Sequence, residues 1–470
     1  MKKTISNIFY SCAAQLMTVI VPLVTSPYIS RVLRPYNLGI YGYISSVSEI
    51  LSVVGSIGLT NYAIREIAYV KDDKEKRSKI FFEIIILRTI LFFVVACFYA
   101  LFMNNKVYST FTIYQLIWFA GYFLDVIWFF NGIEDFKSVV VRTVLIKSLS
   151  IASIFLFVKT QNDLWKYITL MGLCQLLGVI WCYPKLAKLL VTPNLKNLCL
   201  TRHLSPTLKI ALPQIVTMVY FQMDKIMLEN LTSNLSLIAF YDQADKLNKV
   251  PVTIISAVSL VMLPKNSTYV SNEDYKGLNN SISLAVKYTL LLTLPMTLGI
   301  ITISTGFVPW FYGKGYDMVA PIMITLSPII IARGLSSISA NQYLIPTQNT
   351  RYLTVSSIFS AIINVIINYL TIPVMGVYGA VVGTLVAEYS VTLIQYYYML
   401  KNIKINGIIK LGFKYFIFSV IAMIPGVILY KMLGSHIYLT VLQVFFAAVI
   451  YLGLLLISND ESLNIIRKRK

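Results

Sequence analysis

The residues of this chain whose types and spacing could do chemistry are charged side chains inside long apolar stretches. A charge in hydrocarbon is costly, so one that persists there faces a cavity or a partner. Arg142 and Lys147 share one such stretch with no acidic neighbour in it, and Arg31, Arg34 and Arg65 flank the first pair of stretches. Unpaired cations in these positions predict a cavity that receives an anion. Arginine suits phosphate or pyrophosphate because its planar fork can bind two oxygens at once.

The acidic candidate of most interest is Asp125, a lone carboxylate with no base nearby in its own stretch. It could couple transport to a proton or a sodium ion, or it could pair with Arg142 or Lys147 across a helical bundle. The sequence leaves both interpretations open, and an ordinary network of internal salt bridges is the alternative to an anion-binding role for the cations. Asp224 and Glu388 are further candidates for ion coupling, from their position in apolar stretches alone.

For two pairs of charged residues, the sequence spacing favours internal ion pairing over a functional role. Glu83 and Arg88 are five residues apart and could pair loosely, and Asp242 with Lys246 has the i,i+4 spacing of a helical ion pair. The other charges in apolar stretches are Glu49, Lys225, Asp245 and Arg333.

Several kinds of chemistry find no support in the sequence. The two histidines are far apart and the five cysteines form no CxxC pair, so we predict neither a zinc site nor a Ser/His/Asp relay. The cysteines lie in or beside apolar runs, as small core residues do. No glycine-rich phosphate loop of the Walker type is present, which argues against ATP hydrolysis. We expect no metal and no cofactor. The residues concerned are His203, His436, Cys12, Cys97, Cys174, Cys182 and Cys199.

The elements that must position these charges are membrane-spanning helices. Hydrophobic residues make up 57% of the chain and charged residues 13%, against about half and about a quarter in soluble domains, so the surplus must face lipid. One span takes about 20 apolar residues, and the first such run is too long for a cleaved signal peptide. We predict an all-α, polytopic membrane protein with about fourteen spans: 7–30, 38–60, 80–103, 110–132, 138–158, 165–190, 206–229, 236–262, 282–305, 316–339, 352–373, 377–399, 411–432 and 437–458.

The net charge of +20 would suggest nucleic acid in a soluble protein. Its distribution instead fits the excess of Lys and Arg in cytoplasmic loops, because alternate connections are rich and poor in basic residues. Both termini are therefore predicted to be cytoplasmic, with no nucleic-acid partner. Arg31 and Arg34 are exceptions on the outer side. The rich connections hold Lys2, Lys3, Arg65, Lys71, Lys74, Lys76, Arg77, Lys79, Lys196, Arg202, Lys209, Lys265, Lys276, Lys401, Lys404, Lys410 and 467–470.

A polar connection at about 190–205 divides the spans into two halves. Related motifs open spans in both halves, at residues 38–43, 238–242 and 375–380, each after a short outer loop. Such copies of one helical hairpin occur in transporters built from repeats. The expected divisions are an N-terminal six-helix lobe over 1–195, a C-terminal six-helix lobe over 196–405, and two extra helices with a basic tail over 406–470.

A series of short segments resembles one known family. The segments are 27–33 with 39–42, 61–68, 125–132 with Glu134 and Phe136, 224–228 followed by 240–241, 344–347, and 364–368 leading to Pro373 and Gly376. In this order they are similar to the Wzx-type polysaccharide repeat-unit flippases, which share a superfamily with the MATE multidrug exporters. The resemblance covers nearly the whole chain.

The resemblance implies two six-helix lobes around a V-shaped cavity, with two extra C-terminal helices. It implies a flippase that moves undecaprenyl-pyrophosphate-linked oligosaccharides across the bacterial cytoplasmic membrane by alternating access, for capsule, exopolysaccharide or O-antigen-type polysaccharide. The implied partners are membrane lipid and the polymerase and glycosyltransferases of the same pathway. A cationic cavity of this kind would include Arg31, Arg65, Arg142, Lys225 and Arg333, while Arg34 and Lys147 join the set from their positions alone.

Two other functions remain as alternatives. A MATE-type antiporter of cationic drugs would have acidic cavity residues in excess of basic ones, and the surplus of Arg and Lys disfavours it. A membrane polysaccharide polymerase or ligase tends to carry a large outer loop, whereas the predicted outer connections are all short.

Overall fold

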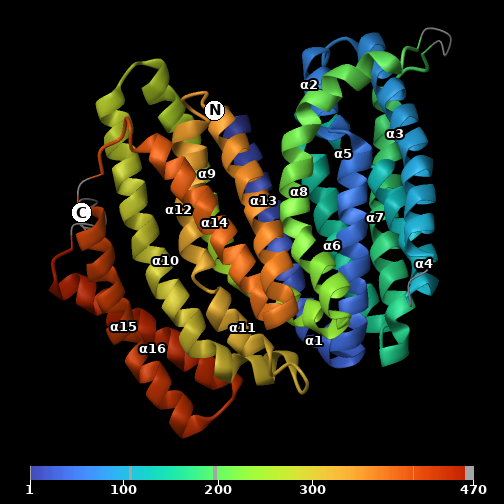
Figure 1. Cartoon of the computed structure of the whole chain (residues 1–470). Coiled ribbons are helices and arrows are strands. Elements are labelled where there is room, and N and C mark those ends of the chain that lie inside the picture. Colours follow the sequence, from blue (N-terminus) through green and yellow to red (C-terminus); the bar gives the residue numbers. More distant parts are fainter. Residues whose placement is uncertain (1, 105–107, 194–197, 406, 461–470) are drawn as a thin grey trace. The chain divides into compact units, whose positions relative to one another are not determined.

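The computed structural model describes residues 2–104, 108–193, 198–405 and 407–460. Within these residues the chain forms helices and no strand, and it divides into two compact units, Met1–Glu229 and Asn230–Lys470 (Figure 1). The lobe boundaries predicted at 195 and 405 stay predictions. The basic tail 467–470 and Lys196 lie outside the described residues.

The first unit is a bundle of long helices with one short broken segment. Its helices are α1 (Lys2–Ser56), α2 (Leu59–Tyr69), α3 (Lys74–Met103), α4 (Thr112–Phe123), α5 (Ile127–Gly132), α6 (Phe136–Phe157), α7 (Leu164–Leu189) and α8 (Leu204–Thr232), whose last residues pass into the second unit. Short 3₁₀ helices occupy Ser109–Phe111, Gln161–Asp163 and Thr201–His203.

The second unit contains α9 to α16 and one π-helical turn. Its elements are α9 (Leu235–Ser271), α10 (Tyr275–Tyr312), α11 (Val319–Leu326), α12 (Ile329–Ile338), the π-helix Ser339–Leu344, α13 (Thr350–Met375), α14 (Val377–Met399), α15 (Ile408–Leu433) and α16 (Ile437–Ile457). The bend between α11 and α12 is 41°.

The protein is an integral membrane protein, as its apolar helices predict. Among the described residues, 11 helices are long and apolar enough to cross a membrane, or 12 if the bent pair that begins with α11 forms one span. The all-α, polytopic prediction is confirmed, but the count of about fourteen is not. The helix α1 contains the first predicted span, 7–30, and most of the second, 38–60, and α8 is not apolar enough to be counted.

The long helix α1 is two helices joined at Arg34. That residue has φ 65° and ψ 166°, outside the helical region. Pro35 follows, and a proline disfavours the helical conformation of the residue before it. The predicted connection between the first two spans is therefore a single kink. A positive φ at a non-glycine residue is uncommon and carries strain.

Helix starts in the loops follow ordinary capping rules. Asp73 caps the start of α3 by accepting a hydrogen bond from the backbone N–H of Lys76 at 3.0 Å. Asp274 caps the start of α10 in the same way, accepting from the backbone N–H of Gly277 at 2.8 Å. Such caps satisfy backbone donors that have no partner inside the helix. The backbone and side-chain hydrogen bonds from Lys76 lower the pKa of Asp73.

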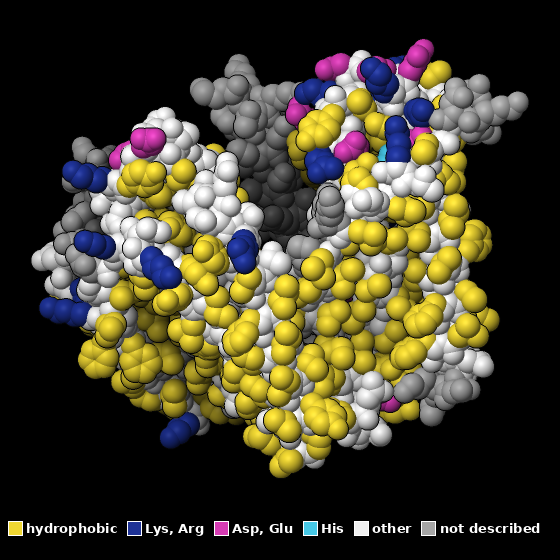
Figure 2. Space-filling model, turned by 45° about the horizontal axis from the view of Figure 1, so that its top comes forward, with side chains coloured by type: hydrophobic (Ala, Val, Ile, Leu, Met, Phe, Trp, Pro, Cys, Tyr) yellow, Lys and Arg dark blue, Asp and Glu magenta, His cyan; other side chains and the backbone are white. Residues whose placement is uncertain are grey.

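Large apolar side chains cover the outer surface of the helices. Figure 2 shows apolar side chains over most of the face that it draws. On α3 the exposed residues include Phe93, Val94 and Leu101, each at least 60% exposed. A soluble monomer rarely exposes so much contiguous apolar surface, whereas a lipid-facing helix requires it.

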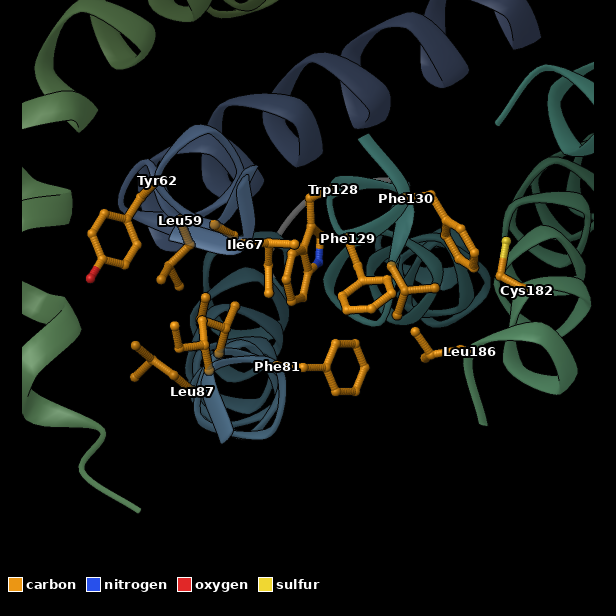
Figure 3. Packing of buried hydrophobic residues seen from close by; sticks show 14 residues of the cluster. Leu59, Tyr62, Ile67, Phe81, Leu87, Trp128, Phe129, Phe130, Cys182 and Leu186 are labelled. Atoms are coloured by element: carbon orange, nitrogen blue, oxygen red, sulfur yellow. The ribbon is translucent and has the colours of Figure 1, made fainter. Parts of the chain in front are cut away.

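An aromatic core holds α2, α3, α5 and α7 together in the first unit. Figure 3 shows Trp128 and Phe129 of α5 packed beside Phe81 of α3 and Ile67 of α2. The ring centroid of Phe81 lies 5.4 Å from that of Trp128 and 5.5 Å from that of Phe129. Aromatic contacts of this kind add stability beyond the area they bury. This core fixes α5, whose start carries the break described below.

The cysteines follow the sequence prediction only in part. Cys174 and Cys182 are buried, but Cys97 and Cys199 are exposed. The side chain of Cys12 is outside the described residues. Among the described residues no cluster of three or more His, Cys, Asp or Glu side chains could hold a metal ion.

Candidate functional site

The fourth predicted span is broken, and a buried arginine closes the break. The helix α4 ends at Phe123 and α5 begins at Ile127, which leaves backbone carbonyls without helical donors. Arg88 of α3 donates from Nε to the carbonyl of Phe123 at 2.7 Å and from Nη2 to that of Tyr122 at 2.6 Å. Its Nη1 donates to Thr60 Oγ1 at 3.0 Å. A cation at the carboxyl end of a helix is favourable, and irregular backbone in a membrane requires such donors.

Asp125 lies in the break and faces Arg142 of α6. Its Oδ1 accepts from the backbone N–H of Ile127 at 3.3 Å, and its carbonyl accepts from Trp128 Nε1 at 2.8 Å. Arg142 Nη2 is 3.6 Å from the same Oδ1. Of the two interpretations that the sequence left open, pairing between Asp125 and Arg142 is present in this structure. A role of Asp125 in ion coupling stays a prediction.

Two donor nitrogens of Arg142 make no hydrogen bond within the described part of the chain. The residue is 6% exposed, yet its Nε and Nη2 make no hydrogen bond to any described group. These two nitrogens form one edge of the guanidinium, which is the geometry that binds two oxygens of a carboxylate or phosphate. Gly178 of α7 makes room for the group, because a Cβ at that position would lie 2.5 Å from Nε. Sequence reasoning missed Gly178, since nothing marks it among the 22 glycines.

Positive charge exceeds negative charge around the break. Lys147, further along α6, is partly buried and makes no ion pair with any described residue. Arg88 and Arg142 add two further cations, and Asp125 is the one carboxylate that pairs with this group in the described residues. The arrangement can therefore accept an anion with little further charge rearrangement.

The other predicted cations of the first unit are spread along its length. Arg31 and Arg34 are exposed at and near the kink of α1, and Arg65 is exposed on α2, where it pairs with Glu66 at 3.2 Å. Residues 35–56 of α1 separate Arg34 from α2 by about 30 Å of helix. On α8, Asp224 is buried and Lys225 is partly buried.

Arg333 in the second unit is held by two carboxylates. Its Nε donates to Glu388 Oε1 at 2.6 Å, and its Nη1 is 3.5 Å from Asp245 Oδ1. Asp245 also pairs with Lys249 one turn along α9. These contacts join α9, α12 and α14. The sequence singled out Arg333 and Glu388 separately, but it could not show that they meet.

The two predicted ion pairs have different outcomes. Asp242 and Lys246 pair at 2.6 Å, which confirms the i,i+4 prediction. The predicted pairing of Glu83 with Arg88 is wrong. Arg88 binds backbone carbonyls, whereas Glu83 binds Arg202 and His203, which are more than 100 residues away in sequence.

The second unit also has an apolar cavity of about 660 Å³. Residues of α10, α15 and α16 line it, among them Pro295, Met423 and Ala447, and Gln443 is one of its few polar groups. None of the predicted charged site residues lines this cavity.

Comparisons with known proteins agree with one another. The model of the polysaccharide biosynthesis protein family matches residues 4–270. A putative O-antigen transporter of Shigella dysenteriae is 23% identical over 412 residues, which cover 86% of this chain and 100% of that protein. The lipid II flippase MurJ of Bacillus subtilis is 26% identical over 171 residues, 36% of this chain and 31% of that protein.

Solved structures show the same fold. The lipid II flippase MurJ in an inward closed conformation superposes with a TM-score of 0.73 at 18% identity, covering 96% of this chain and 99% of that one. An inward-facing MATE multidrug transporter superposes with a TM-score of 0.64 at 14% identity, covering 86% of this chain and 99% of that one.

Proposed function

This chain belongs to the polysaccharide biosynthesis protein family, and we propose that it is a flippase for lipid-linked oligosaccharide repeat units in the bacterial cytoplasmic membrane. It would move them from the cytoplasmic to the outer leaflet by alternating access, for capsule, exopolysaccharide or O-antigen-type polysaccharide. Glycosyltransferases would supply the repeat unit and a polymerase would consume it. The similarity to the O-antigen transporter and to MurJ supports this class of substrate.

The observation that carries the proposal is the buried edge of Arg142, whose Nε and Nη2 make no hydrogen bond to any described group, beside an excess of positive charge. The hard step in flipping is to move sugars and a charged phosphate group through hydrocarbon, which excludes ions strongly. An undecaprenyl pyrophosphate group offers several anionic oxygens. Nε and Nη2 of Arg142 can bind two of them at once, and Lys147 can add a point charge nearby.

The energetics favour an occupied site. A buried donor without a partner costs about 1–3 kcal/mol, and Arg142 has two such nitrogens. Binding an anion would recover that cost. Asp125, at 3.6 Å, would compete with the anion and so keep the affinity low enough for release. This mechanism needs no nucleophile and no acid/base pair, so we propose a transporter and not an enzyme.

The proposal assigns the remaining predicted residues to the same function. Arg31, Arg34, Arg65, Lys225 and Arg333 would guide the anionic substrate along its route, and Asp224 and Glu388 would be candidates for coupling to an ion. Both termini would lie in the cytoplasm. Near the break between α4 and α5, the three cations Arg88, Arg142 and Lys147 outnumber the one carboxylate that pairs with this group in the described residues, Asp125. This balance disfavours export of organic cations, which would require the opposite sign.

The test is complementation of a strain that lacks this gene. Arg142→Ala should reduce surface polysaccharide at least about tenfold, the loss expected when a charge-assisted hydrogen bond of about 1.4 kcal/mol or more is removed. Lipid-linked repeat units should accumulate, with an unchanged amount of the protein in the membrane. Lys137→Ala is the matched control, because Lys137 is an exposed cation on the same helix.

Normal polysaccharide in the deletion strain, with no accumulated lipid-linked intermediate, would refute the flippase proposal. Normal export by Arg142→Ala would instead refute the role given to this arginine. Efflux of organic cations by the wild-type chain would favour the drug antiporter.

A further inference from the structure

The connection between α7 and α8 is fastened to α3 at its near end. Arg77 Nη2 donates to the carbonyl of Leu189 at 2.6 Å, and the backbone N–H of Val191 donates to Ser78 Oγ at 2.8 Å. Arg77 and Ser78 lie in the first two turns of α3. The chain leaving α7 is thus bonded to α3 before it reaches the residues that precede α8.

The far end of the same connection is bonded to Glu83, also on α3. Glu83 is completely buried. Its Oε1 accepts from the backbone N–H of Cys199 at 2.8 Å, and its Oε2 accepts from Arg202 Nη2 and pairs with His203 Nε2 at 2.9 Å. The other ring nitrogen of His203 is 2.9 Å from the hydroxyl of Tyr62 on α2. If Tyr62 donates to Nδ1, a neutral His203 donates from Nε2 to Glu83.

Glu83 therefore depends on the connection for all its partners. A carboxylate with no exposed surface is tolerated only when charges and donors satisfy it. Here the three donors belong to residues 199–203, and Arg202 supplies the compensating charge. If the connection left α3, the carboxylate would lose its counter-charge and its hydrogen bonds together. The segment and the carboxylate form one unit that is stable only when assembled.

We propose that Glu83 is a positioning residue that pins the start of α8 to α3. His203 immediately precedes Leu204, the first residue of α8. A helix held at one end can move mainly at its other end, and about 30 Å of helix separates Leu204 from Lys225. The pin makes the start of α8 a fixed pivot, and it sets where Asp224 and Lys225 stand. The pin does not depend on the proposed function, but its effect on export does.

Hydrogen exchange of the purified full chain tests the pin directly. In wild type the amide of Cys199 should exchange slowly because its N–H is bonded to Glu83, and that of His203 because its N–H is bonded to the carbonyl of Leu200 at 3.2 Å. In Glu83→Ala a peptide covering residues 198–204 should exchange about tenfold faster. Glu75→Ala is the control, since Glu75 is an exposed carboxylate in the first turn of the same helix. Unchanged exchange in Glu83→Ala would overturn the pin.

A milder variant covers the case in which Glu83→Ala does not fold. Arg202 has a 42% exposed side chain, so Arg202→Gln removes the counter-charge without opening the core. It should raise exchange of the same peptide by a smaller factor and lower export. Normal exchange in Arg202→Gln would overturn the pin as well.

A cross-link distinguishes a fixed pivot from a latch that opens in every cycle. Ser78→Cys with Val191→Cys, joined by a short thiol cross-linker, locks the near end of the connection to α3. The proposal predicts that the locked protein still exports, whereas Glu83→Ala, present in the membrane at normal amounts, does not. Loss of export on locking, or normal export by Glu83→Ala, would overturn the positioning role. If the wild-type chain exported no polysaccharide, the flippase proposal would fail while the exchange result still stood.

Discussion

Replacing Gly178 with alanine tests whether the position of Arg142 matters, and not its charge alone. A Cβ at Gly178 would lie 2.5 Å from Nε of Arg142 and 2.8 Å from its Cζ and Nη2. Ordinary contact begins at 3.4 Å, so the guanidinium must move by about 1 Å. The group is the end of a flexible side chain, so this movement should cost little stability. The charge stays, and only its placement changes.

The expected result is a loss of export without a loss of protein. Alanine is favoured over glycine within a helix by about 0.5–1 kcal/mol, which offsets the cost of moving Arg142. A displacement of about 1 Å at a positioned group can reduce turnover by up to about 100-fold. We expect surface polysaccharide to fall about 10- to 100-fold, with unchanged amounts in the membrane and a thermal midpoint within a few degrees of wild type.

The assay is complementation of the deletion strain, with surface polysaccharide and lipid-linked intermediates measured in parallel. Gly453→Ala is the matched control, because no described atom lies within 4 Å of a Cβ built there. The decisive comparison is Gly178→Ala in an Arg142→Ala background, where it should cause no further loss, since residues that act through one another are not additive. Wild-type export by Gly178→Ala, or an equal loss in both backgrounds, would refute the reasoning.

Two further predictions concern the first unit. Arg88→Met should lower the free energy of unfolding by roughly 1–3 kcal/mol, because it leaves the carbonyl of Phe123 without a donor and that of Tyr122 with only the 3.4 Å hydrogen bond from the backbone N–H of Asp125; thermal unfolding in detergent, with Lys74→Gln as an exposed control on the same helix, should show a lower midpoint, and an unchanged midpoint contradicts it. For His203, burial lowers the pKa despite the hydrogen bond to Glu83, so the folded protein binds this proton less readily than the unfolded chain does. Its stabilising contribution is complete above about pH 6.5 and declines as the pH falls, by at most about 1.4 kcal/mol per pH unit. The difference in unfolding midpoint between wild type and His203→Gln should therefore shrink from pH 7.5 to pH 5.5 (about one unit either side of the ordinary histidine value), and a constant difference contradicts it.

The spans could be predicted because their signal is local. An apolar run of about 20 residues reports a membrane crossing whatever lies around it, and charges within such runs, such as Asp125 and Arg142, are conspicuous for the same reason. Pairing of Asp125 with Arg142 was one of the two interpretations that the sequence left open for Asp125. The ion pair between Asp242 and Lys246 could also be predicted, because it depends only on helical spacing.

The rest of the site depends on contacts that sequence does not display. Arg88 binds backbone carbonyls, and every residue has one, so no pattern could identify Phe123 as its acceptor. Glu83 has its partners 116 to 120 residues further along the chain. Gly178 matters because the absence of a Cβ there leaves room for the guanidinium of Arg142, and sequence alone does not show which side chain packs against a glycine. The count of about fourteen spans is not confirmed, in part because the first two apolar runs are continuous through a kink at Arg34.

The arginines that the sequence singled out in the two halves of the chain differ in what neutralises them. Arg333 already binds Glu388 at 2.6 Å and lies 3.5 Å from Asp245, so an anion would have to displace a carboxylate to reach it. Arg142 faces one carboxylate at 3.6 Å, and its Nε and Nη2 make no hydrogen bond to any described residue. Displacing a well-formed buried ion pair is costly, whereas supplying acceptors to open donors is favourable. An anionic substrate is therefore expected to bind at Arg142 first, while Arg333 ties α9, α12 and α14 together.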